Sequence, residues 1–264
     1  MVDQGNGVAA FGAAGPLADP VIEARRLVES AAKAGLIVRV LGGVAVRMQA
    51  SSSETPLLPR PIGDIDLATK QGGWRALADF LKSSGYAGDD MFNALNGARR
   101  LLFFDHTNSR KLDVFVGEFD MCHSIPIASR LDKAPMTIPL AELLLTKLQI
   151  VQLTERDVRD IYTMAYHHPI SAGDGSEIEA DFIADLCAKD WGLWRTCTST
   201  IRQSLDRLPD YPLKPEASAL IASRLSTLLT MIDQAPKTSR WKLRSRVGDR
   251  MRWYAEPEET TPTA

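Results

Sequence analysis

The chain has 264 residues, of which 45% are hydrophobic and 24% charged, and its formal net charge is −2. These values are typical of a globular protein with one large or two modest domains. The small net charge excludes a general electrostatic attraction of the whole protein to nucleic acid or to an anionic membrane. No apolar run reaches the ~18 residues of a membrane-spanning helix, and the three cysteines form no Cys-x-x-Cys pair, so we expect a cytoplasmic protein without disulfides, structural zinc or a membrane partner.

In the first half of the chain, short apolar runs alternate with amphipathic segments. Asp19 followed by Pro20 is typical of a helix start, and Gly35 ends that helix. β-Branched residues over 36–42 predict a strand, and alternating apolar and acidic residues over 62–69 predict another. The other elements expected here are a helix over 44–50, a polar proline-containing loop over 51–61, a helix over 74–85 and a β-hairpin with arms at 99–105 and 111–120.

The second half carries apolar residues at helical spacing in each long segment, with proline or glycine between segments. The helices expected from this spacing cover 138–153, 155–168, 177–208, 215–234 and 240–254. The sequence therefore predicts an α+β fold, with a small mixed β-sheet flanked by helices over 20–136 and a helical bundle over 137–254. Flexible tails are expected over 1–19 and 255–264.

Three acidic residues lie in strand-like surroundings. Successive side chains of a strand point to opposite faces, so Asp64 and Asp66 point the same way while Ile65 and Leu67 point into a core. Asp113 lies among apolar residues of a later strand and becomes a third member if that strand pairs beside the first. Converging carboxylates repel each other unless a cation lies between them, and hard oxygen ligands at this spacing suit Mg²⁺. Such sites are typical of in-line phosphoryl or nucleotidyl transfer.

Two adjacent glycines follow the first strand. A strand that turns through Gly42 and Gly43 into a helix presents open N–H groups and the positive end of a helix dipole to an anion. No Cβ atom blocks the approach of a triphosphate there. Arg47 lies one helical turn beyond Gly43, so its guanidinium can fold back toward the same anion.

Three segments together carry a resemblance to a known superfamily. The segments "GGVAVR" at 42–47, "GDIDL" at 63–67 and "LDVFV" at 112–116 resemble, in order and spacing, the motifs of the nucleotidyltransferase superfamily of DNA polymerase beta. A later segment at 143–162 resembles two helices of the AbiEii-type toxin and related bacterial nucleotidyltransferases, and it puts Lys147 and Asp160 in their site positions. The resemblance covers 36–165.

The resemblance implies a role for each motif residue. It implies nucleotide binding by Gly42, Gly43, Arg47, Lys147 and Asp160, metal binding by Asp64, Asp66 and Asp113, and activation of the acceptor by Asp113. Two features depart from the toxin branch. The loop over 51–61 lengthens the stretch between the glycines and Asp64, and Gly43 replaces a frequent serine, which looks more like the aminoglycoside nucleotidyltransferases.

Other readings of these residues stay open. Lys147, a single lysine among leucines, can extend to solvent, and Asp160 can form a routine helix ion pair with Arg156. The basic, tryptophan-containing segment at 240–254 can bind RNA, or it can be a terminal helix that docks through Leu243, Val247, Met251 and Tyr254 and keeps a solvated basic face.

The sequence therefore predicts an enzyme that transfers a nucleoside monophosphate from a nucleoside triphosphate to an acceptor hydroxyl, with one or two Mg²⁺ ions, and releases pyrophosphate. The acceptor hypotheses are an RNA or tRNA end, as the toxin branch implies, and a small hydroxylated molecule such as an aminoglycoside. A hypothesis of another class is a binding module, for example a toxin–antitoxin partner, without turnover. The carboxylate cluster argues against a binding module, because its repulsion serves no purpose without a metal.

Overall fold

The computed structural model describes residues 15–50, 57–171 and 177–256. Its first half is built on a five-stranded mixed sheet, in which β2 and β5 run parallel and the other neighbours run antiparallel. The order across the sheet is β1-β2-β5-β4-β3. These strands are β1 (Val38–Leu41), β2 (Ile65–Thr69), β3 (Ala87–Gly88), β4 (Arg100–Asp105) and β5 (Arg110–Val116).

Four helices accompany this sheet: α1 (Pro20–Lys33), α2 (Gly42–Gln49), α3 (Trp74–Ser83) and α4 (Asp90–Asn96). The expected start of α1 is confirmed, because Asp19 Oδ1 accepts hydrogen bonds from the backbone N–H groups of Val21 and Ile22 at 2.8 and 2.9 Å. The expected hairpin is confirmed as β4–β5, but its second arm ends at Val116 instead of residue 120, because Gly117 has a φ of +83° and Glu118–Asp120 forms the separate strand β6. The elements β3 and α4 have no counterpart among the sequence predictions.

The second half is mostly helical. Its helices are α5 (Leu140–Leu148), α6 (Glu155–His167), α7 (Ala180–Lys189), α8 (Trp191–Arg207), α9 (Pro215–Gln234) and α10 (Ser239–Ser245). Short strands and 3₁₀ helices complete the fold: β6 (Glu118–Asp120) with β7 (Ser124–Pro126), β8 (Ile170–Ser171) with β9 (Ile178–Glu179), and 3₁₀ turns at Ala128–Lys133, Leu208–Asp210 and Gly248–Arg250. The α+β class is therefore as expected.

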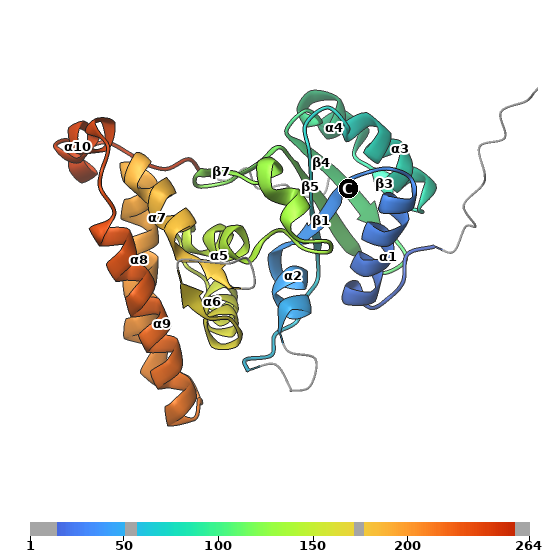
Figure 1. Ribbon diagram of the computed structural model, residues 1–264. Coiled ribbons are helices and arrows are strands. Elements are labelled where there is room, and N and C mark those ends of the chain that lie inside the picture. The colour runs from blue at the N-terminus through green and yellow to red at the C-terminus, as the bar shows by residue number, and fades with distance from the viewer. Residues whose placement is uncertain (1–14, 51–56, 172–176, 257–264) are drawn as a thin grey trace, which may run out of the picture.

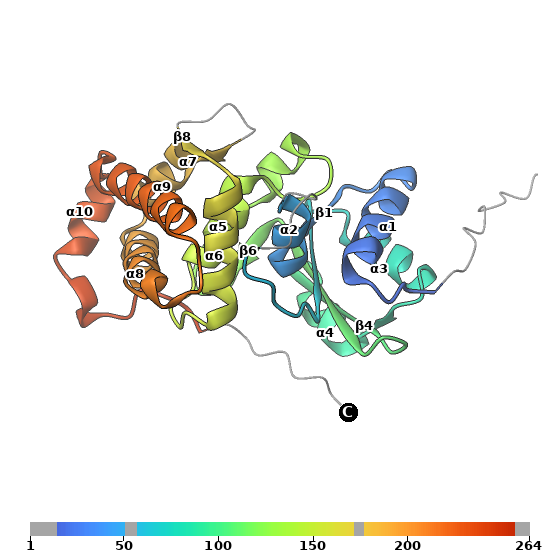
Figure 2. The ribbon, with the colours of Figure 1, turned by 90° about the horizontal axis from the view of Figure 1, so that it is seen from below.

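The two halves share one core. A single cluster of buried hydrophobic side chains extends from Ala24 on α1 to Ile232 on α9. Both ribbon views place α7, α8 and α9 away from α1 and α3, with α5 and α6 between them and the sheet (Figure 1 and Figure 2). The boundary expected at 136/137 stays a prediction. None of the helices in the described part of the chain is both long and apolar enough to cross a bilayer.

Several expected boundaries are wrong. The segment 177–208 is not one helix, because Asp190 ends α7 and its side chain caps α8 by accepting a hydrogen bond from the N–H of Leu193 at 2.9 Å. The helix expected over 138–153 ends at Leu148, and the helix expected from residue 44 begins at Gly42.

The C-terminal helix expected over 240–254 is also wrong. Helix α10 ends at Ser245, and Gly248 has a φ of +60°, a left-handed conformation that interrupts the helix. The expected docking residues do not dock as a stripe, because Leu243 is 65% and Met251 60% exposed. Tryptophan rings pack there instead, with Trp194 and Trp241 centroids 5.2 Å apart.

Parts of the expected tails are fixed in place. The N–H of Leu17 donates to Glu23 Oε2 at 3.1 Å, and Arg110 Nη2 donates to the carbonyl of Leu17 at 2.8 Å. At the other end, the N–H of Ala255 donates to the carbonyl of Cys122 at 3.0 Å. The rest of the expected tails, 1–14 and 257–264, lies outside the described residues, as does 51–56 of the expected loop.

Candidate active site

Two of the predicted carboxylates lie side by side on neighbouring strands. Asp66 on β2 is directly opposite Asp113 on the parallel strand β5, so the two side chains leave the same face of the sheet. The residues that flank them, among them Ile65 and Leu112, are fully buried on the other face. Strand alternation thus holds both acids in place through the packing of their neighbours. Asp64 precedes β2 and is exposed.

The electrostatics of these acids differ. Burial raises the pKa of Asp66 to about 7, and the charges of Asp113 and Asp64 add to this, while Lys147 and Lys111 oppose it. Asp113, only 2% exposed, is paired with Arg100 Nε at 2.9 Å and Lys111 Nζ at 2.8 Å. The carboxylates of Asp64 and Asp66 make no hydrogen bond or ion pair with another described residue. They are therefore the two acids whose oxygens are available to a ligand.

The side chains of the site offer two carboxylates, and not three, to a divalent cation. Across residues 15–50, 57–171 and 177–256, no three His, Cys, Asp or Glu side chains are close enough to hold a metal ion together. Mg²⁺ is commonly bound through one or two carboxylates, with water and substrate phosphates completing its shell. Asp64 and Asp66 supply such a pair, whereas two cations neutralise Asp113. The metal set of three acids, which includes Asp113, stays a prediction.

The glycine turn adjoins the carboxylates directly. Gly42 has a φ of +66°, and a Cβ atom there would lie 2.0 Å from Asp66 Oδ2. Only glycine combines this backbone angle with so close an approach of the carboxylate. A Cβ atom on Gly43 would lie 2.2 Å from Arg60 Nη2, so an arginine guanidinium covers the first turn of α2. The glycines thus make room for Asp66 and Arg60.

Arg60, Lys147 and Asp160 form a buried ion network beside the glycines. Arg60 donates from Nε and Nη2 to the two oxygens of Asp160, at 2.7 Å each, and Lys147 Nζ lies 3.0 Å from Asp160 Oδ2. Burial opposes the charged form of Asp160, yet the Arg60 hydrogen bond and the Lys147 charge outweigh it and lower its pKa. Burial likewise works against charged Lys147, but Asp160 and Asp157 raise its pKa. Both groups are therefore charged at neutral pH, and Asp160 pairs with these cations instead of Arg156.

A cleft of about 600 Å³ opens over these groups. It is lined by Gly43, Arg60, Ile62, Gly63, Asp64, Asp66, Met121, Lys147 and the residues Thr154–Asp157 at the start of α6. Acids without a partner and cations in the lining of one cleft suit a metal-bound polyphosphate. Arg47 does not line this cleft: it is exposed and borders a small neighbouring cavity of about 20 Å³.

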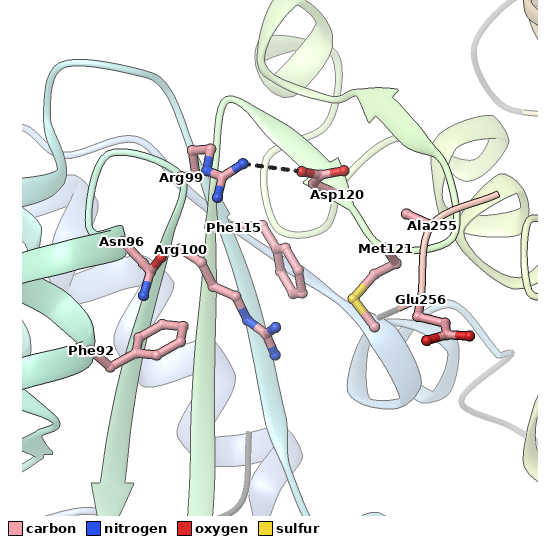
Figure 3. Close-up of a pocket in the computed structure, with 9 residues that line it drawn as sticks. All are labelled: Phe92, Asn96, Arg99, Arg100, Phe115, Asp120, Met121, Ala255 and Glu256. Atoms are coloured by element: carbon pink, nitrogen blue, oxygen red, sulfur yellow. Dashed lines mark ion pairs between the residues drawn. The ribbon is translucent and has the colours of Figure 1, made fainter. Parts of the chain in front are cut away.

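A second hollow, of about 160 Å³, lies on the Arg100 side of Asp113. Figure 3 shows Phe92 and Asn96 reaching toward it from one side and Met121 and Glu256 from the other, with Arg100 and Phe115 between them. The Arg100 guanidinium lies 5.2 Å from the centre of the Phe115 ring. Met121 lines both this hollow and the cleft, so the two adjoin.

Two arginines beside the acids, Arg60 and Arg100, are not among the residues predicted from the sequence. Arg60 lies between two prolines in a loop, and its partner Asp160 is 100 positions away. Arg100 belongs to the expected hairpin, and its pairing with Asp113 depends on the register between β4 and β5. A basic residue on one arm of a hairpin and an acid on the other can be predicted to pair from the sequence. The contact between Arg60 and Asp160 cannot, because no local sequence pattern indicates it.

No protein-family model matches the chain. No curated protein matches it either. Among solved structures, it is similar to an antigenic nucleotidyltransferase-like protein from Paracoccidioides brasiliensis, with 15% identity and a TM-score of 0.42, over 86% of this chain and 98% of that one. Identity and structural similarity this low do not establish a shared activity, so the function has to be inferred from the residues of the cleft.

Proposed function

We propose that the protein is a metal-dependent nucleotidyltransferase, which moves a nucleoside monophosphate from a nucleoside triphosphate to an acceptor hydroxyl. The observation that carries the proposal is the pairing of Asp66 with Asp113 across two parallel strands, against the glycine turn and beside a cleft with buried cations. A fold that only binds has no use for a carboxylate whose pKa is raised to about 7 by burial and, in addition, by the charges of neighbouring acids.

The reaction follows from these residues. Mg²⁺ bound by Asp64 and Asp66 would neutralise the triphosphate and favour departure of pyrophosphate. The oxygen of the acceptor hydroxyl attacks the α-phosphorus, the bond to the bridging oxygen of pyrophosphate breaks, and the hydroxyl proton passes to a carboxylate, the role that the sequence resemblance implies for Asp113. Lys147, charged and bordering the cleft, attracts the phosphates. Pyrophosphate leaves with the electron pair of the broken bond.

The test is label transfer from α-labelled nucleoside triphosphates, with Mg²⁺, to RNA and to small hydroxylated acceptors including aminoglycosides. Replacing Asp66 with Asn removes a charge needed only when metal and phosphate are bound, so the rate should fall by roughly 100-fold or more. The matched control Asp79→Asn, at an exposed position of α3, should leave the rate unchanged. Absence of transfer to every acceptor would favour a binding module. Equal rates for wild type and Asp66→Asn would remove Asp66 from the mechanism.

The AbiEii-type grouping and a toxin–antitoxin role remain predictions from the sequence alone. The choice between an RNA end and a small acceptor depends on surfaces outside the cleft.

A further inference from the structure

A third hollow lies between α10, the start of α8 and the chain that follows α10. Its volume is about 400 Å³. We name it the basic–aromatic hollow after the side chains that line it, which are the cations Lys189, Arg240, Arg244 and Arg252 and the rings of Trp191, Trp241, Trp253 and Tyr254. Asp190 is the acidic residue among its lining. The excess of cations favours an anionic ligand.

The four cationic side chains differ in how many interactions they make with the rest of the protein. Arg244 lies 4.5 Å from the Trp191 ring centre and donates to the carbonyls of Gly248 and Met251 at 2.8 Å each, so it stabilises the hollow itself. The side chains of Lys189 and Arg240 are exposed and make no hydrogen bond or ion pair with any other described residue. These two cations therefore have donors to offer to phosphate groups.

The rings offer a stacking surface. Trp253 is held by its indole N–H, which donates to Thr196 Oγ1 at 3.1 Å, and its ring centre is 5.5 Å from that of Tyr254. Both rings are only half-buried, so part of their surface is open. The guanidinium of Arg252 lies 4.8 Å from the Tyr254 ring centre and is paired with the Glu256 carboxylate. Aromatic rings that stack on a base, together with the unpaired cations Lys189 and Arg240 in the same hollow, suit the bases and phosphates of a nucleic acid.

Shared lining residues connect this hollow with the reaction cleft. Ala255 lines both the basic–aromatic hollow and the hollow of Figure 3, and Met121 lines both the hollow of Figure 3 and the cleft. The hydrogen bond from Ala255 to Cys122 holds the last described segment along this line. In Figure 1 this segment runs back from α10 to the β6–β7 hairpin. A ligand that fills all three hollows is a chain, not a compact molecule.

We propose that the basic–aromatic hollow binds a single-stranded polynucleotide whose hydroxyl end passes Met121 to reach Asp66 and Asp113. The occupant of the hollow is argued from its own charges and rings, and only the fate of the polynucleotide end rests on the proposed nucleotidyl transfer. A cationic small molecule such as an aminoglycoside is repelled by this hollow, because cations outnumber acids along it.

The experiment measures fluorescence anisotropy of short, labelled, unstructured RNA and DNA of the same sequence with the full chain, without nucleotide or metal, over a series of salt concentrations. Wild-type protein should bind, and the affinity should fall as salt rises. Lys189→Gln with Arg240→Gln should lower the slope of log affinity against log salt by about 1.4, since each lost phosphate contact on a single strand removes roughly 0.7. Tyr254→Ala should weaken binding about tenfold.

The controls separate this inference from the proposed function. Arg25→Gln with Lys33→Gln makes the same charge change on exposed positions of α1 and should leave binding and its salt slope unchanged. Asp66→Asn should bind the polynucleotide like wild type while losing transfer. Binding that the Lys189/Arg240 variant retains with an unchanged slope would overturn the inference. Transfer to a small acceptor by a protein that binds no polynucleotide would also overturn it and leave the proposed function standing.

Discussion

At the scale of single residues, Gly42 combines two constraints on one position. Its φ of +66° costs any other residue about 1–2 kcal/mol, and a methyl group would collide with Asp66 Oδ2 at 2.0 Å. Gly35 has a similar φ of +74° but nothing within 4 Å of a Cβ atom. Replacement of either glycine would therefore strain the backbone to a similar degree, but only a side chain at position 42 would contact the site.

This difference makes a matched pair of variants. Gly42→Ala and Gly35→Ala should each lower the free energy of unfolding by about 1–2 kcal/mol through backbone strain, as measured by urea denaturation. Only Gly42→Ala should also lose nucleotidyl transfer, because it displaces the Asp66 carboxylate. Gly42→Ala with full activity would show that the position of Asp66 against α2 does not matter to the reaction.

The residues of the site differ in how well the sequence predicts them. The meeting of Asp66 and Asp113 is foreseeable, because strand alternation fixes the face and apolar neighbours fix the register. The contact of Arg60 with Asp160 is not, because it joins a proline-rich loop to a helix 100 positions later and depends on how α6 packs on α2. The nucleotide-binding role expected of Arg47 stays a prediction, and its side chain is exposed beside a different cavity.

At the scale of elements, the start of α6 stabilises the helix and also borders the cleft. Thr154 caps the helix by accepting a hydrogen bond from the N–H of Asp157, and the Asp157 carboxylate accepts one from the N–H of Thr154 in return. Asp157 also lies 3.4 Å from Lys147 Nζ. The cap thus holds one of the acids that keep Lys147 charged.

Removal of this cap has a measurable cost. Thr154→Ala should lower the free energy of unfolding by about 1 kcal/mol, because the first turn of α6 loses a hydrogen-bond acceptor. Thr154→Ser keeps the hydroxyl and should stay close to wild type. Thermal or urea denaturation of the three proteins checks this. Equal losses for Ala and Ser would point to the threonine methyl group as the stabilising part.

The spacing of apolar residues is sufficient to predict the bounds of some helices and not of others. Helix α9 is found over 215–234 as its spacing and Pro215 predict. The expected helix at 177–208 conceals the break at Asp190, because an aspartate suits an exposed helix position as well as a cap. The expected C-terminal helix is interrupted at Gly248, because this glycine adopts a left-handed backbone conformation. The segment packs through tryptophan rings instead of through an apolar helix face.

At the scale of the whole molecule, one contact joins three regions that are distant in sequence. His123 lies in the β6–β7 turn, and its Nε2 is 2.8 Å from Thr196 Oγ1 on α8. The same oxygen accepts the indole N–H of Trp253 from the C-terminal segment. Because the indole can only donate, the threonine hydroxyl proton is free to donate to His123 Nε2, which requires a neutral ring.

This junction predicts a pH dependence of stability. Burial lowers the pKa of His123 below its usual 6.5, although Asp190 opposes the shift. Below pH 6.5 the unfolded chain therefore takes up a proton that the folded protein does not, so stability falls as pH decreases toward the folded pKa. Above this window the histidine is neutral in both states and contributes no slope. His168, whose pKa burial also lowers, adds to the effect.

The measurement is the free energy of unfolding in urea at about pH 8 and about pH 5. Asp66, whose pKa is raised to about 7, acts in the opposite direction, so the prediction concerns the difference between the proteins. The change from the higher to the lower pH should be more favourable to the folded state in His123→Gln than in wild type, because glutamine cannot be protonated in the unfolded chain. His106→Gln, at an exposed position in the β4–β5 turn, should keep the wild-type pH dependence. If His123→Gln and His106→Gln showed the same slope as wild type, the junction of the β6–β7 turn, α8 and the C-terminal segment would not depend on a neutral histidine. The acid sensitivity would then arise elsewhere, with His168 the next position to replace.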